Sequence, residues 1–492
     1  MENSSILFFT NCELGQASII LAVAHEFLLR PSYSVHIASF PSLAPDVDIL
    51  NERAKMLASA TTTATFHPIN GPSMVDVYSH TPVFLDHFDY HQIGFRGASQ
   101  AFNQFIPMLM NPWDGSQFVA IYRDCVDIIK KVRPAMVVLD PLFVIGLDAC
   151  RVLRWPHVVL SPNTAKDLAP QPWLANLWKY PVLCSGYPYP VPWYLIPLNI
   201  FLTIKIALII MGNQRVRKLR DYRNKHGIPG PNPLFASPPG DKTPYLLVTT
   251  PAADFPCFVP QNFTLCGPIV RPCAPIAQES PQLAAWLSLR PTVLVNMGSH
   301  VTCSPEQERQ FAEGFRMLLD KRRDVQILWK LKRRGERQES ALDCLREAIE
   351  GNRVRIESWL SVEPICVLLS GQVKCMIHHG GSNSYHEAVR AGVPQIVLPT
   401  WFDTYDFAHR AEFRGIGVWG NRNTAPAVKG VDLGKALIRV LASEESIGMA
   451  DRAKKVVTQL EGEGRTIACE KIVDLIRSQK DENKSSVSLT RQ

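Results

Sequence analysis

Hydrophobic and polar positions alternate in the same way twice along the chain. Short apolar runs rich in β-branched and aromatic residues, such as "ILFFT" from residue 6 and "MVVLD" from residue 136, are typical of buried strands. Helix-length amphipathic segments such as "FVAIYRDCVDIIKKV" separate these runs, and the second half repeats the alternation with "TVLVNMGS", "VKCMIHH" and "QIVLP". Strands that alternate with helices predict parallel sheets covered by helices on both faces.

The length of the chain predicts two domains, because 492 residues exceed what one compact core usually holds. A proline-rich stretch without periodicity, "GPIVRPCAPIAQESPQL", indicates a linker between them. We therefore expect an N-terminal domain at 1–268, a linker at 269–285, a C-terminal domain at 286–470, and a helix end followed by a disordered tail at 471–492. Each domain should be a doubly wound, Rossmann-like parallel sheet. Ligands should bind in the cleft beyond the carboxyl ends of the strands.

Composition narrows the function and the compartment. The net charge of +7 is not concentrated in one block, so the sequence gives little support to nucleic-acid binding. The twelve cysteines contain no C-x-x-C pair, which is typical of buried thiols in a reducing compartment. The amino terminus lacks the basic and apolar regions of a signal peptide, so we expect a cytoplasmic protein.

One apolar segment approaches the length of a membrane span. Residues 191–212, "VPWYLIPLNIFLTIKIALIIMG", precede the basic stretch "NQRVRKLRDYRNK". Lys205 would lie near the centre of such a span, where a lysine costs roughly 2.5 to 3.5 kcal/mol. Three interpretations are a true span, an apolar helix beside an acceptor cleft, and an interfacial anchor. We expect the second, with weak peripheral membrane contact as the alternative.

The motif "HHGGSNSYHE" at 378–387 follows a predicted strand and opens a predicted helix that Gly392 closes. Its two glycines permit positive φ and let a ligand approach the backbone. Asn383 or Ser384 is expected to cap the helix, whose free amides and dipole would form an anion site beside His379. The alternative is an ordinary turn with a buried histidine. A zinc site is disfavoured, since adjacent histidines cannot easily share one ion and "HEAVR" lacks the second histidine of H-E-x-x-H.

Residues around this motif complete a nucleotide-sugar pocket. Trp359 ends the strand "VRIESW", where its indole could stack on a planar base. Glu387 lies one helical turn after Asn383, where a carboxylate could accept hydrogen bonds from a ribose diol. Asp403 follows the next strand, where it could hold sugar hydroxyls. All of these positions fall on successive strand ends of one predicted sheet.

The pattern W-x19-H-x-G-x-N-S-x2-E-x4-G-V-P-x4-P-x3-D resembles the donor-binding signature of UDP-dependent glycosyltransferases of the GT-B fold, in the form found in fungal secondary-metabolism enzymes. The stretch "TNCELGQASIILAVAHEFL" also resembles their first strand and helix, so the resemblance covers nearly the whole chain. It implies an inverting transferase that moves a hexose from a UDP-sugar onto an apolar small molecule such as a phenolic, polyketide or terpenoid metabolite. It implies no metal and no cofactor besides the UDP-sugar co-substrate.

The resemblance also implies individual roles. Trp359 would stack on uracil with the Leu360 backbone pairing its edge, Glu387 would bind the ribose, and Asp403 the sugar. The remaining implied donor-binding residues are Gly298, Ser299, His379, Gly381, Ser382, Asn383, Ser384 and Thr404. Two departures concern the donor: "LSVEP" follows the tryptophan in place of the plant-type pattern, and Thr404 stands where many relatives carry glutamine.

The third departure concerns catalysis, because Gln16 stands where relatives carry the histidine base. An amide has no proton affinity near neutral pH, yet the expected partner of the base, Asp140 in "VVLDP", is present. Proton removal could fall to Asp140, with Gln16 orienting it or the acceptor, to His80, His87 or His91, or to an acceptor phenol that is already ionised. Asp140 could also merely cap the next helix. A second function class therefore stays open: a transferase-like lyase, cyclase or binding protein that retains the donor pocket. Another kind of GT-B enzyme, such as a nucleotide-sugar epimerase, is the third function class.

Overall fold

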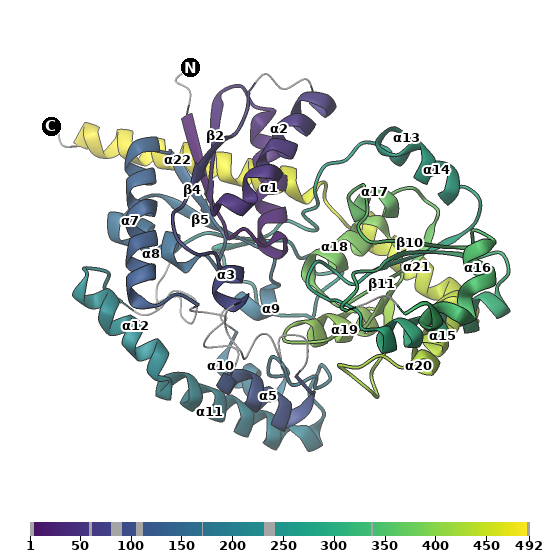
Figure 1. Cartoon of the computed structure of the whole chain (residues 1–492). Helices are drawn as coiled ribbons and strands as arrows, with labels where there is room; N and C mark the ends of the chain where they lie inside the picture. Colours follow the sequence, from purple (N-terminus) through teal and green to yellow (C-terminus); the bar gives the residue numbers. More distant parts are fainter. Residues whose placement is uncertain are drawn as a thin grey trace.

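The computed structural model describes residues 4–58, 62–79, 91–104, 112–169, 171–230, 242–335 and 338–489. Two parallel sheets lie side by side, and helices cover both faces of each sheet (Figure 1). The two doubly wound sheets predicted from the strand and helix alternation are therefore confirmed.

The first sheet has seven parallel strands in the order β3-β2-β1-β4-β5-β6-β7. The order reverses direction between β1 and β4, which are neighbours in the sheet. The side chains of β1 and β4 are almost all buried, as expected for strands covered on both faces. The strands are β1 (Ser4–Phe9), β2 (Tyr33–Ser39), β3 (Thr65–Pro68), β4 (Met136–Leu139), β5 (His157–Ser161), β6 (Tyr245–Leu247) and β7 (Phe263–Leu265).

The second sheet has six parallel strands in the order β10-β9-β8-β11-β12-β13. Its order reverses between β8 and β11, so these two strands flank the crevice in which doubly wound sheets bind ligands. The strands are β8 (Thr292–Asn296), β9 (Gln326–Lys330), β10 (Val354–Glu357), β11 (Val373–His378), β12 (Gln395–Val397) and β13 (Gly417–Trp419).

Several helices begin at sequence-encoded caps. Asp114 and Ser304 each accept a hydrogen bond from the amide three residues on, and a glutamine there bonds back to the cap, which completes a capping box. The helices of the first half are α1 (Leu14–Leu28), η1 (Pro41–Leu43), α2 (Ala44–Ala58), α3 (Met74–Ser79), α5 (Gly94–Gln104), α7 (Gly115–Val132), α8 (Val144–Leu153), α9 (Ala165–Leu168), α10 (Trp173–Trp178), η2 (Trp193–Leu195), α11 (Ile196–Gly212) and α12 (Gln214–Lys225). Those of the second half are α13 (Ile276–Glu279), α14 (Pro281–Leu287), α15 (Pro305–Lys321), η3 (Glu339–Leu345), α16 (Arg346–Glu350), α17 (Pro364–Leu368), α18 (Ser382–Ala391), α19 (Thr404–Phe413), α20 (Gly430–Leu441), α21 (Glu445–Thr458) and α22 (Gly464–Leu489).

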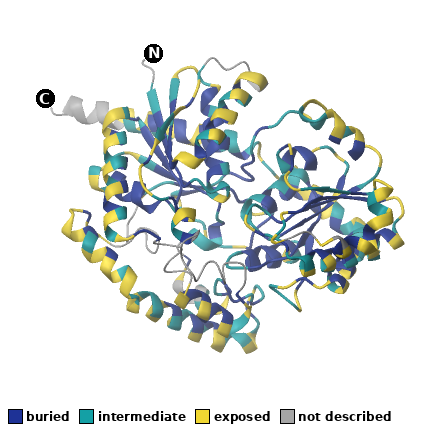
Figure 2. Cartoon of the chain, in the orientation of Figure 1, coloured by how far each residue is buried: buried dark blue, intermediate teal, exposed yellow. Residues whose placement is uncertain are grey.

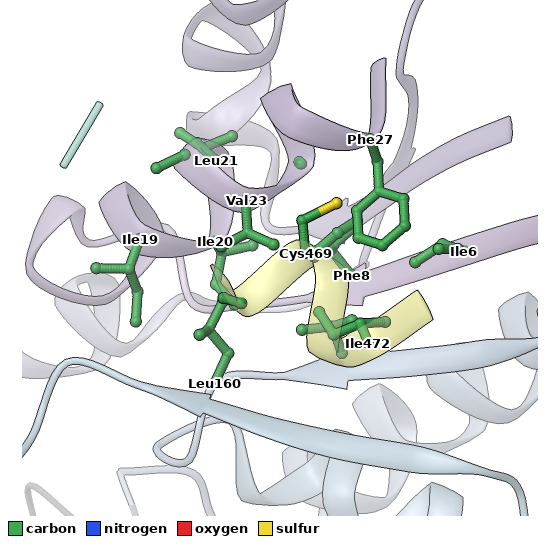
Figure 3. Packing of buried hydrophobic residues seen from close by; sticks show 14 of the residues in the cluster. Ile6, Phe8, Ile19, Ile20, Leu21, Val23, Phe27, Leu160, Cys469 and Ile472 are labelled. Atoms are coloured by element: carbon green, nitrogen blue, oxygen red, sulfur yellow. The ribbon is translucent and has the colours of Figure 1, made fainter. Parts of the chain in front are cut away.

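The last helix, α22, returns to the first sheet. Cys469 and Ile472 of α22 are buried against α1 and the first sheet, in the same cluster as Ile20 and Phe8 (Figure 3). The helix continues to Leu489, so the helix end expected within 471–492 lies near the end of that segment. The N-terminal core is therefore completed by the end of the chain.

The apolar segment forms η2 and α11 on the outside of the molecule. By length and composition alone, Trp193–Gly212 could cross a membrane, and 17% of its most apolar window is buried. Helix α11 buries Leu202 and Ile206 against α5, and Lys205 places its ammonium 4.9 Å from the centre of the Phe95 ring. The opposite face is exposed (Figure 2). It carries one row of large apolar side chains at helical spacing: Tyr194, Leu198, Phe201, Ile204, Leu208 and Met211.

A buried ion network joins α9 and the loop after β6 in the first half to α19 of the second half. Arg410 is fully buried and donates to Asp254 at 2.7 Å and to Asp167 at 3.3 Å. Beside it, Lys166 contacts Asp406 at 2.5 Å. Although burial opposes it, the two cations lower the pKa of Asp167 to about 2. A buried cation of each half is therefore paired with a carboxylate of the other half.

Replacing Arg410 with methionine should strongly destabilise the protein, because Asp167 and Asp254 would remain buried without their cation. We expect a loss of roughly 3 to 5 kcal/mol in the free energy of unfolding, measured by urea denaturation. The matched control is Arg439→Met, which removes an exposed ion pair with Glu445 and should cost at most about 1 kcal/mol. Equal losses in the two variants would contradict a structural role for the network.

Candidate functional site

The carboxyl ends of the strands border a cleft of about 190 Å³ between the two halves of the chain. Residues from the start of α1 form one wall, and the ends of β8, β9 and β11 with α18 form the other. Most of the predicted donor-binding residues line this cleft: Gly298, Ser299, Trp359, His379, Gly381, Ser382, Asn383, Ser384 and Glu387. The sequence did not point to the other lining residues: Leu14, Gly15, Ser18, Asn296, His300, Lys330, Glu363 and Pro364.

The predicted cap of α18 is wrong. The helix begins at Ser382, its N-cap is Gly381, and no side chain caps it. The Ser382 hydroxyl instead donates to the Pro162 carbonyl of the first half. The Asn383 amide donates to the carbonyls of Leu14 and Gly15 at 3.0 and 3.3 Å. These side chains hold the two halves together and leave the first backbone amides of α18 free to bind a ligand.

Two helix N-termini meet at the cleft. Helix α1 starts at Leu14, and its first residues lie opposite the start of α18, to which Asn383 bonds them (Figure 1). No side chain caps α1 either. Each helix end carries about half a positive charge from its aligned peptide dipoles. Two such ends side by side would attract an anion, and the anion site expected at α18 from the sequence stays a prediction.

His379 fits between two glycines of the cleft. A Cβ on Gly298 would lie 2.6 Å from its Cε1, and a Cβ on Gly381 would lie 2.5 Å from its Nε2, so no other residue fits at either position. Its Nδ1 is buried and has no hydrogen-bond partner among the described residues. Burial lowers the pKa of His379 to about 3, with further lowering by His378. The imidazole is therefore neutral and can offer one N–H to a ligand.

His378, by contrast, is a structural residue. Its Nδ1 accepts a hydrogen bond from the Gly380 amide at 3.1 Å, and its Nε2 lies 2.8 Å from Gln395 Oε1. Burial lowers its pKa to about 4. Only the second histidine of the motif reaches the cleft.

Lys330 brings a titratable charge next to the indole of Trp359. Its ammonium lies 3.9 Å from the ring centre, and the indole remains 53% exposed. Burial lowers the pKa of Lys330 to about 8, while burial and Glu363 raise the pKa of Glu387 to about 8. Lys330 ends strand β9. Its place at a strand end was the one sequence signal that could have identified it.

Three predicted donor-binding residues do not line this cleft. The Leu360 side chain is buried in the core, which leaves only its backbone for a base. Thr404 is 1% exposed, and its hydroxyl accepts from the Trp401 amide at 3.1 Å, so this hydroxyl is engaged within its own loop. Asp403 lies at the start of α19, where burial and Asp167 raise its pKa to about 7.

The two predicted catalytic residues are not paired. Among the described residues, no hydrogen bond joins Gln16 to Asp140, and the Gln16 Oε1 is buried without a partner. Asp140 accepts from the Asn11 backbone and side-chain amides at 3.3 Å and from the Leu142 amide at 2.8 Å. Burial raises its pKa to about 7. Asp140 ties two loops together, which favours the structural interpretation over a role with Gln16.

His91 is also committed to structure. Its Nε2 accepts from the Phe402 amide at 2.8 Å, and its Nδ1 lies 3.0 Å from the Gln92 carbonyl. Neither nitrogen is available to take a proton from a substrate, and burial lowers its pKa. The other two candidate bases, His80 and His87, lie outside the described residues.

Known proteins share this architecture. Residues 340–455 match the family described as erythromycin biosynthesis protein CIII-like, C-terminal domain. Glycosyltransferase sdnJ of Sordaria araneosa is 37% identical over 467 residues, which cover 89% of this chain and 90% of that protein. Phytolacca americana UGT2 complexed with UDP-2fluoro-glucose and pterostilbene has a TM-score of 0.63 at 16% identity, covering 96% of this chain and 99% of that one. Glycosyltransferase VinC in complex with DTDP has a TM-score of 0.57 at 17% identity, covering 96% and 100%.

The two facing sheets with a ligand cleft at their switch points define a GT-B fold, which the solved glycosyltransferases share. The extended identity with sdnJ goes further than fold. The chain belongs to the glycosyltransferase family. The family, the fold and the enzyme class predicted from the sequence are confirmed.

Proposed function

We propose that this glycosyltransferase uses a UDP-sugar and transfers the hexose, with inversion, to a hydroxyl of an apolar small molecule. The observation that carries the proposal is the convergence of the α1 and α18 N-termini beside Lys330 and the exposed indole of Trp359. A nucleoside diphosphate combines the two groups such a cleft accommodates, a dianion and a planar base. The Phytolacca structure, which is complexed with UDP-2fluoro-glucose and pterostilbene, supports this choice of donor and acceptor classes.

Each part of the UDP-sugar is assigned to its own residues. Uracil stacks on Trp359 with its edge at the Leu360 backbone, and the ribose diol bonds to Glu387. Asp403 would bind hydroxyls of the sugar, which extends beyond the cleft. The diphosphate lies among the free α18 amides and the residues Gly298, Ser299, His379 and Ser384.

The same groups account for leaving-group stabilisation. When the bond between the anomeric carbon and the diphosphate breaks, negative charge grows on the departing UDP. Helix N-termini that are already oriented stabilise this charge without reorganisation, and the Lys330 ammonium adds to them. The proposed reaction therefore needs no metal ion.

A second candidate keeps the donor pocket but not the transfer chemistry. It is favoured by Gln16, which replaces the expected base and makes no bond to Asp140 among the described residues. In that case the protein would bind a UDP-sugar tightly and transfer it to none of a wide panel of alcohols and phenols. Recovery of transfer in Gln16→His would support this candidate.

Replacing Trp359 with alanine should weaken UDP binding by about 1 to 3 kcal/mol, because the base loses its stacking partner. Isothermal titration calorimetry with UDP measures the dissociation constant directly. Trp178→Ala is the matched control, since that indole is also exposed but lies outside the cleft. An unchanged UDP affinity in Trp359→Ala would exclude the uracil site. Parallel titrations with GDP and dTDP would show whether another base is preferred.

UDP-sugar affinity should fall as the pH rises through 8. Below that pH Lys330 is charged and Glu387 is protonated, so the pair carries one positive charge; above it the pair carries one negative charge. The diphosphate of a UDP-sugar keeps its charge over this range. We expect a loss on the order of tenfold between pH 6.5 and 8.5. Lys330→Met combined with Glu387→Gln should give a flat profile, whereas affinity that rises with pH in the wild type would contradict the assignment.

We also propose a cytoplasmic protein that contacts anionic membranes weakly through α11 and α12. Helix α11 presents the exposed apolar row that includes Phe201 and Leu208. Helix α12, which follows directly, exposes Arg217, Lys218 and Arg220. Apolar side chains that enter the interface beside cations that attract lipid headgroups are typical of a peripheral contact. Lys205 packs on Phe95 of α5, so α11 is held against the protein. The proposed contact therefore needs no membrane-spanning helix.

Co-sedimentation with lipid vesicles tests this contact. The protein should bind vesicles that contain phosphatidylserine, release in high salt or carbonate, and bind phosphatidylcholine vesicles far less. Phe201→Ser with Leu208→Ser should reduce binding at least about tenfold, because two apolar side chains that would enter the lipid interface are lost. Ile447→Ser, an exposed apolar position elsewhere, is the control. Extraction from membranes only by detergent would contradict a peripheral contact.

A further inference from the structure

The loop between β1 and α1 and the first turn of α1 hold a cluster of unpaired hydrogen-bond acceptors. Three oxygens from six consecutive residues are buried and have no donor among the described residues: Asn11 Oδ1, Glu13 Oε2 and Gln16 Oε1. Buried polar groups are nearly always hydrogen-bonded in folded proteins. Three unpaired acceptors in one short segment therefore point to a ligand that supplies hydroxyl donors.

Glu13 is the charged member of this cluster, and its position is well defined. Its Oε1 accepts from the Val75 amide at 3.1 Å and from the Cys12 thiol at 3.7 Å. One carboxylate oxygen is thereby anchored to α3, while Oε2 stays free. The next two residues, Leu14 and Gly15, line the donor cleft. Glu13 therefore stands at the border between the donor cleft and the N-terminal domain.

The other candidate proton acceptors within the described residues are unsuitable. Both carboxylate oxygens of Asp140 accept hydrogen bonds, three in all from amides, and the Thr10 hydroxyl lies 3.4 Å from Oδ2. Both nitrogens of His91 are bonded, and Gln16 is an amide without basicity. Burial raises the pKa of Glu13, and Asp76 acts in the same direction, which makes its carboxylate a stronger base than an exposed one.

We propose that Glu13 is the general base of this glycosyltransferase and takes the place of the missing histidine. The inference rests on the proposed UDP-sugar transfer. The proton of the acceptor hydroxyl moves to Glu13 Oε2 as the acceptor oxygen bonds to the anomeric carbon. The bond from that carbon to the diphosphate oxygen breaks, and its electron pair leaves with UDP. Asn11 Oδ1 and Gln16 Oε1 accept hydrogen bonds from ligand hydroxyls and position them.

The acceptor's own acidity gives the sharpest test. An alcohol needs a base, whereas a nitrophenol that is already ionised needs only alignment. Glu13→Gln keeps the shape of the side chain and should lower kcat by ~10² or more with alcohols. With ionised nitrophenols the loss should stay below about tenfold, and the dissociation constant for UDP should not change. Asp48→Asn removes an exposed carboxylate on α2, so this control should keep wild-type rates.

The outcomes separate this inference from the proposed function. Wild-type protein that fails to bind UDP or to transfer any sugar overturns the proposed function itself. Wild-type transfer combined with equal losses for alcohols and nitrophenols in Glu13→Gln overturns the role of Glu13 as a base. A selective loss for alcohols in Asp140→Asn but not in Glu13→Gln would assign the base to Asp140 instead.

Discussion

The pairing of buried charges around Arg410 decides how the two sheets face each other. A guanidinium removed from water is tolerated only where carboxylates neutralise it, and Asp167 of α9 and Asp254 of the loop after β6 do so from the first half. Arg410 itself lies on α19 of the second half, as does Asp406, which neutralises Lys166. Each half thus supplies a carboxylate partner for a buried cation of the other half. These pairs form only when the carboxyl ends of the two sheets meet.

The cleft and its anion site follow from this meeting. Once the halves are in contact, Ser382 and Asn383 find backbone carbonyls of the first half as partners. Their side chains would otherwise compete for the amides at the start of α18. With these side chains engaged elsewhere, the amides of α18 and those of α1 remain for a ligand. The contact between the two halves and the cleft are therefore one structural unit.

The charge of the site comes from two sources that respond differently to pH. The helix dipoles and the neutral His379 are constant near neutral pH, since burial lowers the pKa of that histidine to about 3. Lys330 and Glu387, by contrast, both have pKa values of about 8 because burial disfavours their charged forms. Backbone would thus provide a permanent attraction for the proposed diphosphate, and the two side chains would adjust it.

The sequence by itself determined the alternation of strands and helices, the two sheets and most of the donor cleft. Residues that follow parallel strands reach one common edge, so the spacing from Trp359 to Glu387 sufficed to bring them together. Tertiary structure alone decided which side chains are free. The Thr404 hydroxyl bonds within its own loop, and the Asp140 carboxylate accepts hydrogen bonds from Asn11 and Leu142. The partners of Ser382 and Asn383 lie more than 200 residues away in the sequence. Hydrogen bonding and burial depend on neighbours that only the assembled halves provide, and no local pattern encodes them.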